Sequence, residues 1–196
     1  PDMSILTELD ASQMVSQLDS SSPGDPPAEP PVRDAILKIS DQTDYVSFSD
    51  ILKPECYVGA CKIGEGVYGE VFGITRGEEK TVVKIIPVEG DFCVNGADQK
   101  TYQEIIPELH ISVDLCKLQF PANDPPDLLT SGFVPILKVS LVQGRYPREL
   151  LDLWTKFEES KVSDGWEPLE YSPEIFEEEQ LYVVIEQANG GTDLES

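Results

Sequence analysis

The chain has 196 residues, which is enough for one domain of roughly 150 residues with additional tails. It carries 37 acidic against 14 basic side chains, a net charge of −23, which argues against direct nucleic-acid binding. Such a surface would attract a basic partner, although most of these side chains are expected to form only a solvated acidic surface. No apolar run is long enough to span a membrane, and the four cysteines and single histidine lack the spacing of a zinc site.

The first 31 residues are predicted to be a disordered, acidic and proline-rich tail. Its second half is rich in proline, which can neither continue a helix nor donate a hydrogen bond within a sheet. A short amphipathic helix in the first half of the tail is the alternative. Order is predicted to begin near Val32, and Ser47–Leu52 is predicted to form a short helix with Ser47 or Ser49 as its N-cap.

Three glycines follow at the spacing Gly64-x-Gly66-x-x-Gly69, with Val71 two positions further on. Glycine permits positive φ, and without a Cβ it lets backbone N–H groups come close to an anion, so the run predicts a loop over phosphates. A plain glycine-rich turn and a dinucleotide-binding loop share this spacing. The dinucleotide loop needs a helix to begin within the run, whereas here β-branched and aromatic residues follow. A P-loop is excluded because no Gly-Lys-Ser/Thr follows.

A β-rich stretch, Thr81–Ile86, carries Lys84 in the strand after the glycine hairpin. A glycine loop followed by a strand lysine is the layout of a protein-kinase phosphate clamp. Pro87 is expected to end the pairing of this strand, because proline has no backbone N–H to donate.

A polar insertion and a long helix are predicted next. The insertion, Asp91–Lys100, contains the turn signal Asn95-Gly96. Apolar residues recur at helical spacing over Thr101–Leu118 and form one stripe. Pro107 is expected either to bend the first turns of this helix or to mark a late start, and Glu108 lies beside the stripe.

The remaining elements complete the predicted fold. Val134–Val142 is typical of a strand, and a short amphipathic helix is predicted around Leu150–Phe157, with Pro147 near its start. The acidic stretch Glu158–Glu179 is predicted to be an exposed loop, and Gln180–Glu186 a buried strand. The order β-β-β-α-β-β predicts an α+β fold built on an antiparallel sheet.

These motifs together resemble the haspin family of atypical eukaryotic serine/threonine protein kinases. The resemblance extends from Ser47 to Ser196, and the elements Asn95-Gly96 and Ile106-Pro107-Glu108 separate it from ordinary kinases. It implies a kinase N-terminal lobe over residues 32–196, up to and including the hinge, with a five-stranded antiparallel sheet, a long regulatory helix and helical insertions.

The resemblance also implies a set of site residues. Lys84 would hold the α- and β-phosphates of ATP and pair with Glu108. Asp193 would receive the substrate, or would instead cap a following helix. Gln187 would stand at the gatekeeper position, where the family often has an aromatic residue. The residues implied to contact ATP are Ile63, Gly64, Glu65, Gly66, Val67, Tyr68, Gly69, Val71, Val83, Lys84, Gln187, Ala188, Asn189 and Gly190.

By the same resemblance, the parent protein would transfer the γ-phosphate of ATP to a threonine in the basic N-terminal tail of histone three, in the nucleus and on chromosomes during mitosis. The chain contains neither a His-Arg-Asp catalytic loop nor an Asp-Phe-Gly motif. The proton acceptor and the Mg²⁺ ligands are therefore expected in a C-terminal lobe of the parent chain, which is absent here. A catalytically dead, kinase-like binding module is the alternative function.

Overall fold

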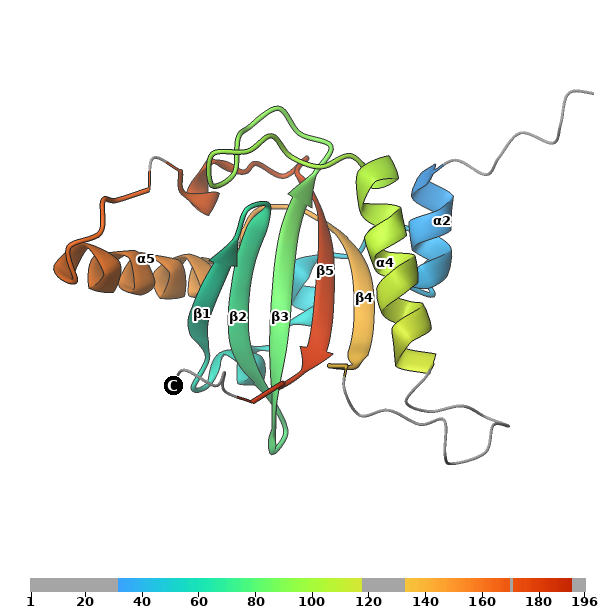
Figure 1. Cartoon of the computed structure of the whole chain (residues 1–196), viewed down its shortest axis with the longest axis horizontal. Coiled ribbons are helices and arrows are strands. Elements are labelled where there is room, and N and C mark those ends of the chain that lie inside the picture. The colour runs from blue at the N-terminus through green and yellow to red at the C-terminus, as the bar shows by residue number, and fades with distance from the viewer. Residues whose placement is uncertain (1–31, 118–132, 170, 192–196) are drawn as a thin grey trace, which may run out of the picture. The chain divides into compact units, whose positions relative to one another are not determined.

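A five-stranded antiparallel sheet with helices on both faces forms the described part of the chain (Figure 1). The computed structural model describes residues 32–117, 133–169 and 171–191, so the predicted tail lies outside it. The strands are ordered β1-β2-β3-β5-β4, and all pairs of neighbours are antiparallel. The elements in chain order are α2 (Val32–Ile39), α3 (Phe48–Ile51), the 3₁₀ turn η2 (Pro54–Tyr57), β1 (Cys61–Gly66), β2 (Gly69–Arg76), β3 (Glu79–Val88), α4 (Tyr102–Lys117), β4 (Ile136–Gln143), α5 (Arg148–Ser163), the 3₁₀ turn η4 (Pro173–Ile175) and β5 (Leu181–Ala188).

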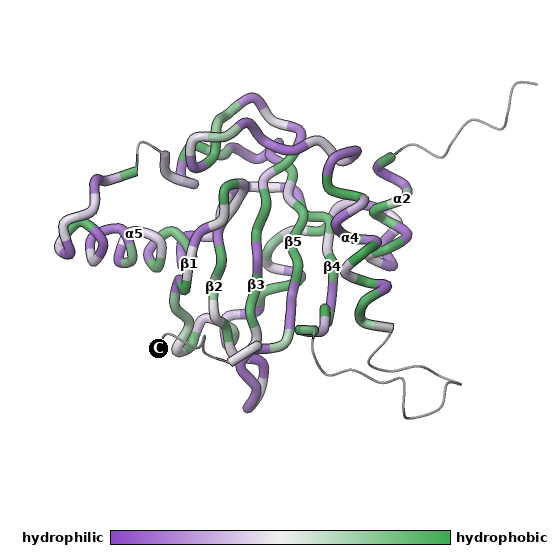
Figure 2. Tube along the Cα trace, viewed as in Figure 1, coloured by the Kyte–Doolittle hydropathy of each residue, from purple (hydrophilic) through white to green (hydrophobic). Residues whose placement is uncertain are grey.

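The two faces of the sheet are separated by the alternation of side chains along each strand. On β3, Lys84 points to one face and Val83 to the other. We call the first the Lys84 face. The opposite one is the Lys62 face, because Lys62 pairs across the sheet with Phe72, which pairs with Val83. Figure 2 shows hydrophobic and hydrophilic residues following each other along the strands and along α5.

The Lys62 face holds the larger core. Helices α3 and α5, the turn η2 and the segment around η4 pack there against apolar side chains of β2, β3, β4 and β5. Aromatic rings dominate, and the ring centroids of Phe48 and Tyr182 lie 4.9 Å apart. Ser47 begins α3 as predicted, since the carboxylate of Asp50 accepts hydrogen bonds from its backbone N–H at 2.8 Å and from its Oγ at 2.6 Å.

The Lys84 face is covered over only part of its width. Helices α2 and α4 pack on the end formed by β4, β5 and the last residues of β3, where Ile105 and Leu109 contact the strands (Figure 1). Among the described elements, no helix lies on this face over the half formed by β1, β2 and the start of β3 (Figure 1). A ligand therefore has access to Lys84 from the open half of the sheet.

Most predicted elements are present, and the fold class is confirmed, but two local predictions were wrong. The first is that Pro87 does not end β3, which continues to Val88 with Pro87 opposite Tyr182. Beyond Ile85, β3 no longer pairs with β2, so the strand can include a residue without a backbone N–H there, and Val88 forms a bridge with Lys100. Of the two alternatives for Pro107, a late start of the helix is excluded, because α4 begins at Tyr102.

The second wrong prediction concerns Glu158–Glu179, which is not simply an exposed loop. Helix α5 continues to Ser163, and the segment after it buries Tyr171 and Phe176 in the core of the Lys62 face. Glu158 is itself buried. The prediction relied on the acidic content of the segment and overlooked Tyr171 and Phe176, whose rings pack it against the sheet.

Candidate functional site

The glycine run forms the connection between β1 and β2, with Gly66 and Gly69 as the last paired residues. Its three glycines are required for different reasons. A Cβ at Gly69 would lie 2.2 Å from the carbonyl oxygen of Ile85, so the neighbouring strand excludes any side chain there. A Cβ at Gly64 would meet no atom of the protein within 4 Å, and one at Gly66 only a backbone oxygen at 3.8 Å. Gly64 and Gly66 therefore leave open space in which backbone N–H groups can approach an anion.

Lys84 and Glu108 form the ion pair expected from the sequence. Lys84 Nζ lies 3.2 Å from Glu108 Oε1, and the side chains are 32% and 38% exposed. The pair connects β3, under the glycine loop, to the middle of α4. Its partial exposure leaves the lysine charge available to a ligand as well as to the carboxylate.

A second lysine, Lys100, shares the same carboxylate, and the sequence analysis did not single it out. Its Nζ lies 3.2 Å from Glu108 Oε2 and 4.4 Å from the centre of the Tyr68 ring at the tip of the glycine loop. Burial pushes the pKa of Glu108 upward, but the charges of Lys84 and Lys100 outweigh it and hold that pKa below its usual value. Two cations thus stand beside the glycine loop in a strongly acidic chain, an arrangement suited to a polyanion.

An apolar wall and the end of β5 complete the open half. A cavity of about 440 Å³ is bordered by Ile63, Val82, Asn189 and Gly191, and it does not extend to Lys84. Gln187 pairs with Val82 and therefore faces the same side as Lys84, half-buried. The backbone N–H of Ala188 donates to the carbonyl oxygen of Pro135 at 3.0 Å. Asn189 and Gly190 are exposed, as a segment that contacts a ligand through its backbone needs to be.

Two implied contact residues lie elsewhere than expected. Val83 is 1% exposed and packs in the core of the Lys62 face, so Val82 is the β3 residue beside Lys84 that can touch a ligand. Glu65 pairs in register with Glu70 and also faces away from Lys84, toward Lys62 and Lys161. Val71 lies opposite Lys84 on the expected face, and the loop tip, Val67 and Tyr68, is exposed. Asp193 lies outside the described residues.

The end of β5 is fixed from the Lys62 face by a contact that the sequence analysis missed. Arg76 Nε and an Nη donate to the two carboxylate oxygens of Glu186 at 2.6 and 2.9 Å, and the same Nη donates to the carbonyl of Ile51 at 2.7 Å. This bidentate pair is geometrically specific and holds the residue directly before Gln187. Only the fold brings together residues 110 positions apart in the chain.

Metal binding and membrane insertion find no support within the described ranges. No group of three or more histidine, cysteine, aspartate or glutamate side chains there could hold a metal ion. Among the same residues, no helix has the length and apolarity needed to cross a bilayer.

Comparison with known proteins decides the family. A family model described as a haspin-like kinase domain matches residues 11–196. The chain belongs to the haspin-like kinase family. Its five-stranded sheet with α4 accordingly has the arrangement predicted for a kinase N-terminal lobe.

Relatives from distant organisms carry the same name. The chain is 41% identical over 155 residues to the serine/threonine-protein kinase haspin of Bos taurus, covering 79% of this chain and 19% of the relative. It is 37% identical over 166 residues to the haspin homolog of Drosophila melanogaster, with coverages of 81% and 28%. The homolog of Arabidopsis thaliana is 34% identical over 150 residues, with coverages of 76% and 23%. The matched part of the chain thus spans 19% to 28% of the length of these haspin kinases.

Proposed function

We propose that this haspin-like chain is the ATP-binding lobe of a kinase that transfers the γ-phosphate of ATP to a protein hydroxyl. The observation that carries the proposal is the Lys84–Glu108 pair on the open half of the sheet, beneath a loop whose first two glycines leave room for a ligand. Neither feature is needed to hold the fold, and both suit bound phosphates.

Each group has a task in this proposal. Lys84, held in place by Glu108, positions the α- and β-phosphates, because an ammonium group is a compact charge with three donors. Backbone N–H groups between Gly64 and Gly69 cover the phosphates, while Ile63, Val71 and Val82 pack against the adenine. Backbone groups of residues 187–190 bind the edge of the base.

Mg²⁺ would neutralise charge on the β- and γ-phosphates. The described residues offer no cluster of ligands for it, so we place its ligands, and the acceptor of the substrate proton, in a C-terminal lobe of the parent protein. The residues of this chain then bind and orient the nucleotide, and the activity belongs to the intact parent.

For the substrate, we propose the basic N-terminal tail of histone three, phosphorylated on a threonine in the nucleus. The support is the naming of the relatives as haspin and the net charge of −23, which attracts a cationic peptide from a distance. Asp193 is the proposed acceptor for the positive end of this peptide. Long-range attraction speeds encounter, while contacts of this kind supply selectivity.

A catalytically dead binding module is less consistent with the glycine loop. Such a module would still need Gly69, because Ile85 leaves no space for a side chain. It would have no steric need for Gly64 or Gly66, and no need for a half-exposed lysine between them and α4.

The test uses the full-length protein and the substitution Lys84→Met. Affinity for ATP·Mg²⁺ and phosphate transfer to a histone three tail peptide are both measured. We expect the wild type to bind and transfer, and the variant to lose on the order of tenfold or more in affinity, because charge-assisted contacts to phosphate disappear. Lys138→Met, an exposed lysine on β4, is the matched control and should behave as wild type.

Three results would contradict the proposal. A wild type that binds no nucleotide would favour the dead module. A Lys84→Met variant with unchanged transfer would remove Lys84 from the phosphate site. Transfer to unrelated peptides but not to the histone tail would keep the kinase and reject the substrate.

A further inference from the structure

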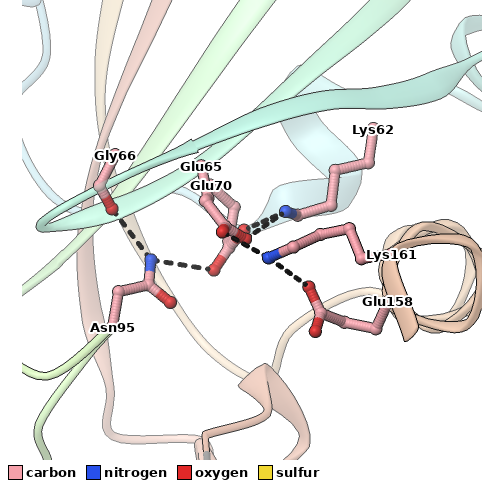
Figure 3. Close-up of polar contacts among 7 residues, drawn as sticks. All are labelled: Lys62, Glu65, Gly66, Glu70, Asn95, Glu158 and Lys161. Atoms are coloured by element: carbon pink, nitrogen blue, oxygen red, sulfur yellow. Dashed lines mark hydrogen bonds and ion pairs between the residues drawn. The ribbon is translucent and has the colours of Figure 1, made fainter. Parts of the chain in front are cut away.

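A cluster of charged and polar side chains lies on the Lys62 face, directly behind the glycine loop (Figure 3). We call it the back cluster. Lys62 Nζ lies 2.9 Å from Glu70 Oε2 and 3.2 Å from Glu65 Oε2, and the side chains of Lys62 and Glu70 are 0% and 1% exposed. Its members are Lys62, Glu65, Glu70, Asn95, Glu158 and Lys161.

The position of this cluster is informative because a buried ion pair is rarely a gain in stability. Removing two charges from water costs about as much as their attraction returns, so apolar residues would serve a core equally well. Burial raises the pKa of Glu70 even with Lys62 beside it, which reflects this cost. Lys62, Glu65 and Glu70 all belong to the two strands that carry the glycine loop. Half of the cluster's residues therefore come from the hairpin that forms the glycine loop.

Asn95 makes the direct contact with the loop itself. Its Nδ2 donates to the carbonyl oxygen of Gly66 at 2.8 Å and to Glu70 Oε1 at 3.4 Å (Figure 3). The residue has φ +50° and is followed by Gly96 at φ +83°, a left-handed pair in a tight turn. Val94 and Ala97 close this turn with two backbone hydrogen bonds of 2.8 and 2.9 Å, and Val94 is buried in the core. A fixed turn therefore presents the amide to Gly66.

Helix α5 contacts the same hairpin through its last turns. Lys161 Nζ lies 2.6 Å from Glu65 Oε1 and 3.5 Å from Glu158 Oε1. Lys62 Nζ lies 3.9 Å from the centre of the Phe157 ring. Two separate parts of the chain, the turn at Asn95 and the end of α5, thus restrain one loop from behind.

We propose that the back cluster holds the glycine loop in its nucleotide-binding position before any nucleotide arrives, and that Asn95 is the positioning residue. This inference rests on the proposed ATP site. Glycine has the largest backbone freedom to lose, so an unrestrained glycine loop must be ordered by the ligand at the expense of affinity. A loop that is already restrained from the opposite face spares the nucleotide this cost. None of the cluster's side chains needs to touch the nucleotide to have this effect.

The experiment replaces Asn95 in two ways in the full-length protein. Asn95→Gly removes both side-chain hydrogen bonds and keeps a residue that adopts positive φ without strain. Asn95→Asp keeps the shape, but replaces the donor with a carboxylate that faces the Gly66 carbonyl and Glu70. Asp41→Gly is the matched control, since Asp41 is exposed, has φ +53° and lies away from the loop.

Two quantities are measured at a temperature where every variant stays folded. The first is hydrogen exchange of the backbone amides of residues 63–70 without nucleotide, and the second is affinity for ATP·Mg²⁺ together with KM and kcat. In Asn95→Gly we expect exchange to speed up, and affinity to fall, by about three- to tenfold, the worth of one or two hydrogen bonds. Asn95→Asp should show a larger effect, KM for ATP should change more than kcat, and Asp41→Gly should match wild type.

If the backbone amides of residues 63–70 in Asn95→Gly exchange hydrogen at the wild-type rate, the proposal is overturned, whatever the affinity for ATP·Mg²⁺. Faster exchange with unchanged affinity would also overturn it, because the restraint would then have no consequence for binding. Failure of the wild type to bind nucleotide would instead reject the proposed ATP site, and the exchange measurement would still decide whether Asn95 restrains the loop.

Discussion

The pairs Lys62–Glu70 and Lys84–Glu108 lie on opposite faces of one sheet, and they differ in exposure more than in distance. Lys62 and Glu70 lie 2.9 Å apart with almost no exposure, whereas Lys84 and Glu108 lie 3.2 Å apart and are each about one-third exposed. The first pair is closed to any ligand. The second stands on the open half of the sheet, under a loop with free space.

This difference separates a structural role for Lys62 from the binding role proposed for Lys84. A buried charge that loses its partner cannot be solvated by water instead. Removing either member of the Lys62–Glu70 pair therefore destabilises the fold. A half-exposed pair is screened by solvent and contributes little to stability, which leaves the lysine free to act on a ligand. The same two residue types therefore predict opposite results when they are mutated.

The largest expected effect is loss of stability in Lys62→Met. The substitution leaves the carboxylate of Glu70 buried without a cation, which costs about 3–5 kcal/mol and lowers Tm by roughly 10 °C for a domain of this size. Thermal and urea unfolding measure it. The double variant Lys62→Met/Glu70→Gln should recover a large part of the loss. A single-variant loss below about 1 kcal/mol would show that the pair is not the structural one.

The next effect separates the glycines of the loop. Gly69→Ala forces the backbone away from Ile85 and should destabilise the protein by about 1–3 kcal/mol, as overpacking does. Gly64→Ala meets no atom of the protein, so its unfolding curve should match that of the wild type while nucleotide affinity falls. Equal stability losses in the two variants would refute this division of roles.

A smaller change in stability is expected for Lys84→Met. Because its pair with Glu108 is partly exposed, the loss should be about 1 kcal/mol or less in urea unfolding. The contrast with Lys62→Met, at equal chemistry of substitution, is the direct measure of how the two faces differ. Comparable losses from the two substitutions would contradict the assignment of Lys84 to ligand binding.

The smallest effect is in the pH dependence of stability, and its sign differs between the pairs. Lysines hold the pKa of Glu108 down, so its contribution is complete above the unfolded value of about 4.3 and is lost as pH falls through the lower folded value. Burial raises the pKa of Glu70, so the folded chain takes up that proton first, and its contribution to stability rises as pH falls toward about 4.3. In urea unfolding across pH 3–7, the two substitutions should change the pH dependence of stability in opposite directions: Glu108→Gln removes a loss of stability at acid pH, and Glu70→Gln removes a gain. Changes in the same direction would show that the environment of Glu108 or of Glu70 is not the one described.

Much of the sheet could be predicted from local pattern. The β-rich stretches, the glycine spacing and the serine before α3 each carry a short-range signal, and all lie where they were expected. The pair of Lys84 and Glu108 was implied by family resemblance, which carries long-range information that periodicity lacks. The sequence also allows a prediction of which face of the sheet Val82 occupies. Residues two apart on a strand lie on the same face, so Val82 lies on the face of Lys84.

The rest depended on contacts between distant parts of the chain. Lys161 and Glu65 are 96 residues apart, and nothing local to either predicts that the last turns of α5 reach the glycine hairpin. The burial of Lys62 and of Glu158 contradicts their residue type, and only neighbouring charges make it tolerable. The tolerance of Pro87 within β3 could not be predicted without the strand order. The energetic cost of its missing N–H depends on which neighbouring strand would have accepted that hydrogen bond.

Side chains along β3 alternate between the two faces of the sheet, so each residue's position in the strand decides which face it occupies. Thr81, Val83 and Ile85 are buried on the Lys62 face, while Val82 and Lys84 lie on the Lys84 face. Inserting or deleting one residue between the turn at Gly77 and Lys84 would exchange the two sets. The ammonium group of Lys84 would then be buried, and Val83 would be exposed. Substitutions in β3 can therefore accumulate singly, whereas changes of length in this stretch are tolerated only in steps of two.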